Sequence, residues 1–422
     1  MTDEIHSSEL AKRIGPQFGA DRMRNSTALE ANAARVIFEP ASVDEICEVV
    51  RMCETDRITL APIGAARTLS QIRRSPVAVG ISLKRLSRIV AYEPDDMTVV
   101  AEAGLTVSDF NAIAAASRQR LPVDPPNPQV TTLGSLIGAS HAGPLRLSEG
   151  TARDLLIGIR FVGHGGRVIH GGGRVVKNVA GYDLMKVMGG AFGTLGIITE
   201  ATFKVRPIPP QYRLAILPYE RAADAFGAAS ALNFALPMSH VEILSPSLGA
   251  RLDAPNKFLL MTGFSGTSLE IGYQAEKIRE LLGDAGEILD VQPSRERYEM
   301  LRDFDWTAMP LAAQIATRPA GLERALNACG VEFRAHAGSG VAQMFVGTTP
   351  TTSDARKIVA RWREIAHAER GHLRVLAAAD VVRNDLEMFD QPNEGALRLM
   401  RRLKSTFDPA SIFNPACFVA GI

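Results

Sequence analysis

The hydrophobic positions in the first part of the chain alternate between strand and helix patterns. Residues 35–38 predict a strand, and Ser42 with Glu45 has the spacing of a capping box ahead of a helix with one apolar face. Residues 57–61 predict the next strand, so this segment is expected to be a parallel, right-handed β-α-β unit. The sequence PIGAARTLS follows at 62–70 and predicts a turn with no helix after it.

A second unit begins at the strand in MTVVAEAG, which ends at Gly104. A helix is predicted over 108–117, and the prolines of LPVDPPNPQ (121–129) then require an extended loop. A glycine-rich segment follows. The sequence LLIGIRFVGHGGRVIHG then predicts a hairpin that turns at 163–166.

The glycines that follow have an unusual order for a nucleotide site. Asn178 is expected to cap a helix that runs to Met188, with Gly189 and Gly190 ending it and an alternating strand after them. A dinucleotide-binding fingerprint places its glycines after a strand and before a helix, where the helix N-terminus faces the pyrophosphate. Here the order is reversed, which disfavours a nicotinamide-binding Rossmann enzyme.

The second half of the chain begins at RPIPPQ, where the composition changes, and a domain boundary is expected at 207–211. Beyond it, strand and helix patterns alternate in two rounds, which predicts a ferredoxin-like antiparallel sheet covered on one face. The strands are expected at 212–218, 240–244, 258–262 and within LAAQIATRP, VEFRAHAGSGVAQMFVG and LRVLAAA, and the helices at 220–232, 268–283, 320–329 and 352–369. The final RLKSTFDPASIFNPACF predicts a structured tail that docks elsewhere.

Composition and charge narrow the class of protein. The 422 residues are 46% hydrophobic and 22% charged, with a net charge of +1, which is typical of a soluble globular protein and not of a nucleic-acid or anionic-membrane binder. No apolar run is long enough to span a bilayer, and MTDEIHSSEL lacks the features of a signal peptide. The four cysteines are scattered without a CxxC pair, which argues for reduced thiols in the cytoplasm and against an iron–sulfur or zinc site in this chain.

Four segments of small residues suggest a different use for the glycines. Residues without a Cβ let the backbone lie against a flat, extended ligand and offer its N–H and C=O groups directly. The segments are 62–68, 132–138, 143–150 and 193–198, and successive N–H groups at 63–68, with Arg67 nearby, could hold a pyrophosphate without a helix dipole.

At this point the sequence resembles the vanillyl-alcohol-oxidase/PCMH-type FAD-binding flavoproteins, and within them the FAD-binding subunits of bacterial glycolate oxidases. The resemblance is carried by TLGSLIGASHAGPLRLSEGTARDLLIGIRFV (132–162), VVKNVAGYDLMKVMGGAFGTLGIITEATFKVRPIP (175–209) and RLKSTFDPASIFNP (402–415). It implies an α+β fold with an N-terminal arm (1–34), a two-lobed FAD domain (35–209, lobes about 35–90 and 97–209), a ferredoxin-like cap (210–392) and a C-terminal helix and tail (393–422) that returns to the FAD domain.

The resemblance also implies which residues contact the cofactor. Residues 62–68 would form the pyrophosphate loop, 132–135 would follow the ribityl chain and flavin, and 193–198 would pass the adenosine half. The loop lacks the histidine that tethers a covalent flavin, so the FAD is expected to be non-covalent. The full expected set is Pro62, Ile63, Gly64, Ala65, Ala66, Arg67, Thr68, Pro125, Thr132, Leu133, Gly134, Ser135, Gly138, Gly143, Gly150, Arg153, Asp154, Gly193, Gly196, Ile197, Ile198 and Asn414.

The chain departs from the family's catalytic subunits in the cap. Those subunits that act on D-2-hydroxyacids carry H-A-G-D-G-N-x-H and a later E-H-G, which hold a divalent metal. Here the stretch is HAGSGVAQ from His336 to Gln343, with Ser339 in place of the acid and no later E-H-G. One histidine cannot build a catalytic metal site, so no metal is expected.

Three functions remain open from the sequence. The first is the FAD subunit of a cytoplasmic, multi-subunit 2-hydroxyacid (glycolate-type) dehydrogenase, with a sister flavin subunit and an iron–sulfur subunit as partners that could hold it at the inner membrane face. The second is a self-sufficient FAD-linked dehydrogenase of a small hydroxyacid or alcohol, with His141, Tyr182 or His336 as the base. The third is a flavin-free scaffold subunit. No particular catalytic residue is selected.

Overall fold

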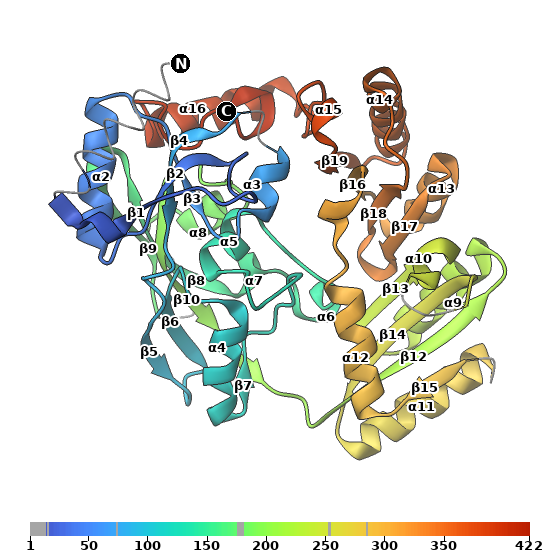
Figure 1. Ribbon diagram of the computed structural model, residues 1–422. Helices are drawn as coiled ribbons and strands as arrows, with labels where there is room; N and C mark the ends of the chain where they lie inside the picture. Colours follow the sequence, from blue (N-terminus) through green and yellow to red (C-terminus); the bar gives the residue numbers. More distant parts are fainter. Residues whose placement is uncertain (1–13, 15–16, 73–74, 175–180, 252–254, 284–285) are drawn as a thin grey trace.

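The computed structural model describes the chain except residues 1–13, 15–16, 73–74, 175–180, 252–254 and 284–285. Two lobes built on a four-stranded and a five-stranded sheet form one side of the molecule, and a third unit with an eight-stranded sheet forms the other (Figure 1). None of the helices in the described residues has the length and apolarity needed to cross a membrane.

The first lobe has the strand order β1-β2-β4-β3 and the predicted helix. The Ser42 hydroxyl accepts from the Glu45 N–H at 3.2 Å and starts helix α2, whose apolar face joins the core. The bounds are β1 (Met23–Asn25), β2 (Ala34–Phe38), α2 (Val43–Thr55), β3 (Leu60–Ile63), α3 (Arg67–Ile72) and β4 (Val77–Ser82).

Three details of this lobe correct the sequence analysis. Strands β2 and β3 are parallel but do not pair, because the fully buried strand β4 lies between them and pairs with both. Within the part of the predicted N-terminal arm that the structure describes, β1 pairs with β2 and Ile14 is fully buried, so these residues belong to the lobe. The turn at 62–66 does lead into a helix, α3, whose Ile72 packs in the core of the cap; that tertiary contact has no signal in the local sequence.

The second lobe is an antiparallel sheet with the order β5-β6-β10-β8-β9. The predicted hairpin at 163–166 joins β8 and β9, and the predicted helix over 108–117 is α4 with a 3₁₀ turn, η2. The bounds are β5 (Ile89–Glu93), β6 (Thr98–Glu102), α4 (Val107–Ala114), η2 (Ala115–Ser117), β7 (Gln119–Arg120), α5 (Leu133–Gly138), α6 (Arg146–Glu149), α7 (Ala152–Leu155), β8 (Leu156–Gly163), β9 (Arg167–Gly172), β10 (Ile197–Lys204) and β11 (Arg206–Pro207), which pairs with β7.

The helix predicted from Asn178 begins later in the structure. Asn178 lies outside the described residues, and helix α8 spans Leu184–Met188. The carboxylate of Asp183 accepts from the Lys186 N–H at 3.2 Å, so Asp183 is its N-cap.

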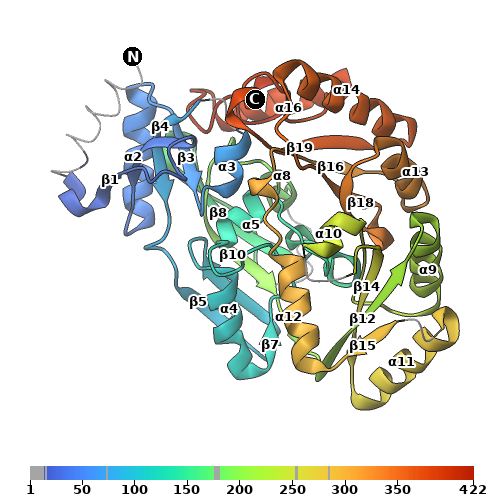
Figure 2. The ribbon, with the colours of Figure 1, turned by 45° about the vertical axis from the view of Figure 1, so that its right-hand side comes forward.

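The cap contains two ferredoxin-like halves joined edge to edge. The first half has the order β15-β12-β14-β13 and the second β17-β18-β16-β19, and antiparallel pairing of β13 with β17 makes one eight-stranded sheet. Helices α9, α11, α13 and α14 cover the outer face, while α12 lies on the face toward the two lobes (Figure 2). The bounds are β12 (Gln211–Tyr219), α9 (Ala222–Ala235), β13 (His240–Leu244), α10 (Pro246–Ala250), β14 (Phe258–Gly266), α11 (Ser268–Leu282), β15 (Glu287–Leu289), α12 (Val291–Arg302), η4 (Trp306–Ala308), β16 (Leu311–Ala316), α13 (Pro319–Cys329), β17 (Glu332–His336), η5 (Ala337–Ser339), β18 (Val341–Val346), α14 (Thr352–Ala368), β19 (His372–Ala378) and α15 (Asp380–Arg383).

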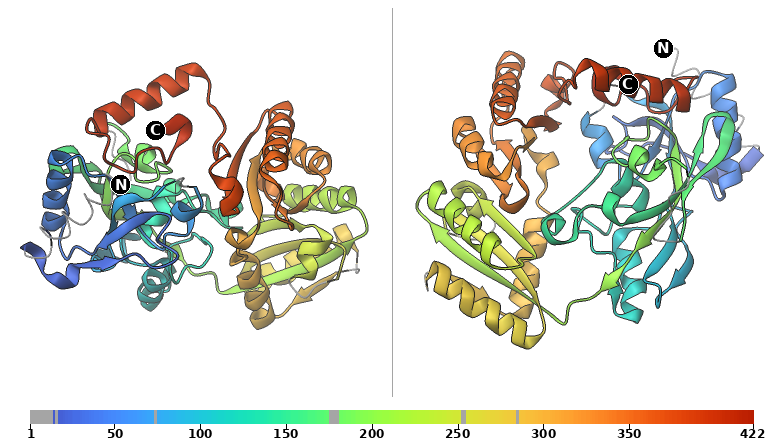
Figure 3. Two further views of the ribbon diagram at one scale, coloured as in Figure 1. Left: turned by 45° about the horizontal axis from the view of Figure 1, so that its top comes forward. Right: turned by 180° about the vertical axis from the view of Figure 1, so that it is seen from behind.

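The tail docks on the first lobe, as predicted. Helix α16 (Glu394–Phe407) crosses back from the cap, and both views of Figure 3 place it over the two lobes. The Leu60 N–H then donates to the Ile412 carbonyl at 2.9 Å, and the Asn414 N–H donates to the Leu60 carbonyl at 2.6 Å. The tail therefore adds a short parallel bridge to the outer edge of β3.

Candidate functional site

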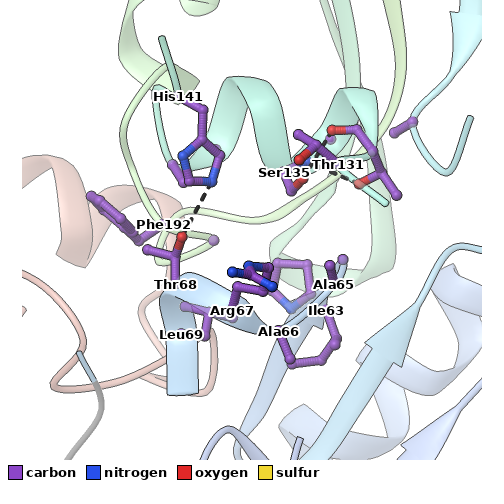
Figure 4. Close-up of a pocket in the computed structure, with 18 of the residues that line it drawn as sticks. Ile63, Ala65, Ala66, Arg67, Thr68, Leu69, Thr131, Ser135, His141 and Phe192 are labelled. Carbon is purple, nitrogen blue, oxygen red and sulfur yellow. Dashed lines mark hydrogen bonds between the residues drawn. The ribbon is translucent and has the colours of Figure 1, made fainter. Parts of the chain in front are cut away.

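One pocket lies where the two lobes and the cap meet. Its wall is made by the β3–α3 turn, by α5 and the residues around it, by the 188–198 segment, and by Phe304 and Trp306 of the cap. These segments are distant in the sequence, and Figure 4 shows the α3 and α5 regions facing each other across the pocket. Three of the four small-residue segments thus line one slot.

Glycine is required in this wall because the segments touch. A Cβ on Gly64 would lie 2.8 Å from the Ser135 Cβ, and a Cβ on Gly193 would lie 2.4 Å from the Pro62 Cγ. Gly193 also has a φ of +71°, which favours glycine. By contrast, a Cβ on Gly138 would meet no atom within 4 Å, so the slot is open at this point.

Most of the residues predicted to contact a cofactor line this pocket. They are Pro62, Ile63, Gly64, Ala65, Ala66, Arg67, Thr68, Thr132, Gly134, Ser135, Gly138, Gly193, Gly196 and Ile198. The small residues of this set and the open space at Gly138 leave room for a long, flat ligand.

The other predicted residues do not line the pocket and have structural contacts. Gly143 lies against the Asp124 carbonyl, which a Cβ would approach to 2.0 Å. Asp154 caps α7 by accepting from the Thr151 N–H at 2.8 Å, and Asn414 donates to the Phe192 carbonyl. The remaining residues outside the pocket lining are Pro125, Leu133, Gly150, Arg153 and Ile197.

The sequence analysis missed the cap's contribution to the wall. Phe304 and Trp306 follow the polar helix α12, and no periodicity in that region connects them with the glycine segments. Asp305 between them accepts from Arg67 Nη2 at 2.5 Å, so the loop of the first lobe is tied to the cap. The Arg67 guanidinium is therefore already paired with the Asp305 carboxylate. Other lining residues that were missed are Leu69, Leu83, Lys84, Ala103, Pro126, Asn127, Thr131, Ala139, Met188 and Phe192.

His141 is the titratable histidine of the pocket wall. Its Nε2 lies 3.2 Å from the Thr68 hydroxyl (Figure 4). Burial, together with the nearby positive charges of Arg374 and Arg67, lowers the pKa of His141 to about 4. The imidazole is therefore neutral at pH 7.

Because the pKa of His141 is lowered in the folded state, His141 should reduce the stability of the protein as the pH falls. The unfolded state, with a histidine pKa of about 6.5, binds the proton more readily, so stability rises with pH between about 4 and 6.5. From pH 7 to pH 5, the parent protein should lose about 2 kcal/mol more unfolding free energy than His141→Asn. Denaturant titrations at both pH values, with FAD content matched, measure this difference. An equal loss in both proteins would contradict it.

His336 and Gln343, the ends of the HAGSGVAQ stretch, each have a partner inside the cap sheet. His336 Nδ1 lies 2.7 Å from Glu242 Oε1, and Gln343 Oε1 accepts from Arg334. Within the described residues, no group of three His, Cys, Asp or Glu side chains is placed to hold a metal ion. Of the three candidate bases, His141 lines the pocket, His336 is buried in the cap sheet and Tyr182 is 91% exposed.

Comparison with known proteins identifies the class. The model for FAD binding domains matches residues 34–172, and the model for the C-terminal domain of FAD linked oxidases matches residues 335–417. The chain therefore carries the FAD binding domain and the C-terminal domain of FAD linked oxidases, and it is an FAD-dependent oxidoreductase.

Individual relatives agree with this family. The chain is 24% identical to a mitochondrial D-lactate dehydrogenase [cytochrome] of Arabidopsis thaliana, covering 93% of this chain and 74% of that protein. It is 26% identical to the glycolate oxidase subunit GlcD of Bacillus subtilis, covering 90% and 87%. It is also 38% identical to the glycolate oxidase subunit GlcE of Escherichia coli over 122 residues, which are 29% of this chain and 35% of that subunit.

Solved structures confirm the fold. An alkyldihydroxyacetonephosphate synthase superposes with a TM-score of 0.70 at 16% identity, covering 96% of this chain and 85% of that one. Substrate-bound p-cresol methylhydroxylase has a TM-score of 0.70 at 16% identity, covering 98% and 96%. The two-lobed FAD domain with a second, antiparallel domain is therefore the fold of this family.

Proposed function

We propose that this chain is the FAD-bearing subunit of a multi-subunit 2-hydroxyacid dehydrogenase of the glycolate type. Bound FAD would accept a hydride equivalent and release single electrons, which few protein side chains can do. The chain's own residues would bind the cofactor, exclude water from it and hold the neighbouring polar groups. Its partners would be a sister FAD-linked catalytic subunit and an iron–sulfur subunit that receives the electrons.

The observation that carries this proposal is a pocket lined by three of the four small-residue segments, next to a cap whose described residues include no group placed to hold a metal ion. His336 and Gln343 would have to turn outward to bind a metal, but each is already paired inside the cap sheet. The likeness to glycolate oxidase subunits GlcD and GlcE supports a role in such a complex.

Within the slot, the wall residues would have separate roles. The 62–68 turn would hold the pyrophosphate with backbone N–H groups, 132–135 would follow the ribityl chain and flavin, and 193–198 would pass the adenosine half. Phe304 and Trp306 would cover the slot from the cap and reduce the access of water. Because the loop carries no histidine, the FAD would be non-covalent.

A self-sufficient dehydrogenase is the second candidate. The D-lactate dehydrogenase of Arabidopsis matches along most of its length, and neutral His141 in the pocket wall could accept a proton. This candidate predicts turnover by the chain alone, whereas the subunit proposal predicts turnover only with partners.

Purification of the tagged chain from native extract tests the proposal. We expect a yellow preparation with about one FAD per chain, released into the supernatant by acid precipitation, and co-purifying flavin and iron–sulfur proteins. The isolated chain should oxidise glycolate or D-lactate poorly with an artificial acceptor and gain nothing from zinc or manganese. A solitary 45.4 kDa monomer with robust turnover would favour the second candidate.

A further inference from the structure

The lobes and the cap meet on two sides of the cofactor slot, and the two sides differ in chemistry. On one side, Ile72, Ala139 and Phe192 of the lobes are buried in the same hydrophobic cluster as residues of the cap sheet. The centre of the Phe192 ring lies 5.5 Å from that of Phe389 in the cap and 5.8 Å from that of Phe418 in the tail. This side is therefore an apolar core that the lobes, the cap and the tail share.

The other side is formed by residues 291–308 of the cap, which contain α12 and η4 and which we call the α12–η4 edge. Three polar contacts join this edge to the lobes: Tyr298 Oη to Asp124 Oδ2, the Asn127 N–H to Asp303 Oδ1 at 2.8 Å, and Arg67 Nη2 to Asp305 Oδ1 at 2.5 Å. Phe304 and Trp306 of the same edge line the slot, whereas the three cap residues of these contacts do not. The edge thus covers the slot and is tied to the lobes beside it.

The α12–η4 edge is itself fixed to the cap. A backbone N–H of β12 donates to Ser294 Oγ at 3.0 Å, and the centre of the Phe304 ring lies 5.0 Å from that of Phe345 on β18. Leu301 and Trp306 are buried in a hydrophobic cluster of the cap. The edge therefore moves with the cap sheet, and separation would occur between the edge and the lobes.

The two sides also differ in how strongly they resist separation. Opening the apolar side would expose buried aromatic and aliphatic side chains, whereas opening the α12–η4 side would exchange polar contacts for contacts with water. The side chains of Arg67 and Asp305 are already 30% and 45% exposed, and exposed ion pairs contribute little to stability. Proteins open first where few apolar contacts are lost, so the α12–η4 side is the weaker one.

We propose that the α12–η4 edge is the gate through which FAD enters and leaves the slot, with the shared apolar core as its hinge. A ligand that is enclosed by lobes and cap without a covalent bond needs such a path, and Phe304 and Trp306 stand between the slot and the solvent on this side. The inference rests on the proposed function only for the non-covalent FAD, and it is independent of the partner subunits.

The rates of FAD exchange in the full chain test the proposal. Replacement of bound FAD by isotope-labelled FAD, followed by mass spectrometry, gives the release rate, and tryptophan quenching after mixing flavin-free chain with FAD gives the association rate. In the triple variant Tyr298→Phe, Asp303→Ala, Asp305→Asn, both rates should rise by at least about tenfold, because three contacts of the closed state are lost. The dissociation constant should stay within about threefold, since the closed state is weakened equally with and without FAD.

Asp305→Asn alone keeps the size of the side chain and should speed exchange by about two- to fivefold. Added salt should speed exchange in the parent more than in Asp305→Asn, because salt screens the Arg67–Asp305 pair. Glu369→Gln is the matched control. Glu369 is also a partly exposed carboxylate paired with an arginine, Arg324 at 2.7 Å, but the pair joins α13 and α14 on the outer face of the cap. This variant should exchange FAD at the rate of the parent.

Unchanged exchange in a folded triple variant and in Asp305→Asn would overturn the proposal. A faster release with an unchanged association rate would also overturn it, because these side chains would then hold FAD directly and not gate it. FAD that stays with the protein on acid precipitation would instead count against the proposed non-covalent cofactor.

Discussion

Replacing Gly138 with leucine should abolish FAD binding while the protein stays folded. Gly138 ends helix α5, lines the pocket, and a Cβ there would meet no protein atom within 4 Å. The Cβ of a leucine therefore has no clash with the chain, and we expect the rest of the side chain to extend into the pocket and compete with the cofactor. Leucine also has a higher helix propensity than glycine by about 0.8 kcal/mol, so the substitution should not cost stability.

The ratio of flavin to protein absorbance, after purification with excess FAD, measures FAD binding. A cooperative thermal unfolding transition shows that the variant is folded. Gly272→Leu is the matched control, because Gly272 is also helical, in α11, with nothing within 4 Å of its Cβ position but outside the pocket. It should keep the FAD content of the parent. A yellow Gly138→Leu protein with one FAD per chain would show that the cofactor lies elsewhere.

Lys404→Met should destabilise the protein by about 3 kcal/mol, because it leaves a buried carboxylate without its cation. Lys404 Nζ donates to Asp408 Oδ2 at 2.6 Å and to the carbonyls of Thr194 and Phe413, each at 2.8 Å. The Asp408 side chain is fully buried and also accepts from the N–H groups of Ile412 and Phe413. One ammonium therefore joins helix α16, the docked tail and the 193–198 segment.

Equilibrium unfolding in urea measures this loss. Arg401→Met, one turn earlier on the exposed side of α16, removes a cation from the same helix and should change stability by less than about 0.5 kcal/mol. The double variant Lys404→Met, Asp408→Asn should recover part of the loss, because the uncompensated charge is gone. A Lys404→Met protein as stable as Arg401→Met would show that this contact contributes nothing to tail docking.

The order of strands and helices could be predicted wherever hydrophobic periodicity was strong. The cap follows the predicted alternation of strands and helices except for the short edge strand β15, which was not predicted. Helix α12 was not predicted, because it is largely polar and buries only Ser294 and Leu301. The place of β4 between β2 and β3 was not predicted either, since strand order depends on which edges pair and not on local sequence.

Part of the cofactor slot could also be predicted, because its glycines stand out in the sequence. Glycines at 64, 134, 193 and 196 are favoured by close contacts in the pocket wall, and such a concentration of glycines is visible in the sequence. Gly143 has the same appearance but is needed against Asp124, so glycine alone does not separate packing from binding. Phe304 and Trp306 enter the site only through the way the cap folds over the lobes, and no spacing in the chain encodes that.

The docking of the tail on β3 sets an order of events during synthesis. Residues 34–204, which form both lobes, emerge from the ribosome long before residues 408–414, and the whole cap is made in between. Until then, the Phe192 carbonyl lacks the Asn414 amide and the Thr194 carbonyl lacks the Lys404 ammonium. The nascent lobes thus lack both of these contacts on the 192–194 side of the slot until the last part of the chain has been made.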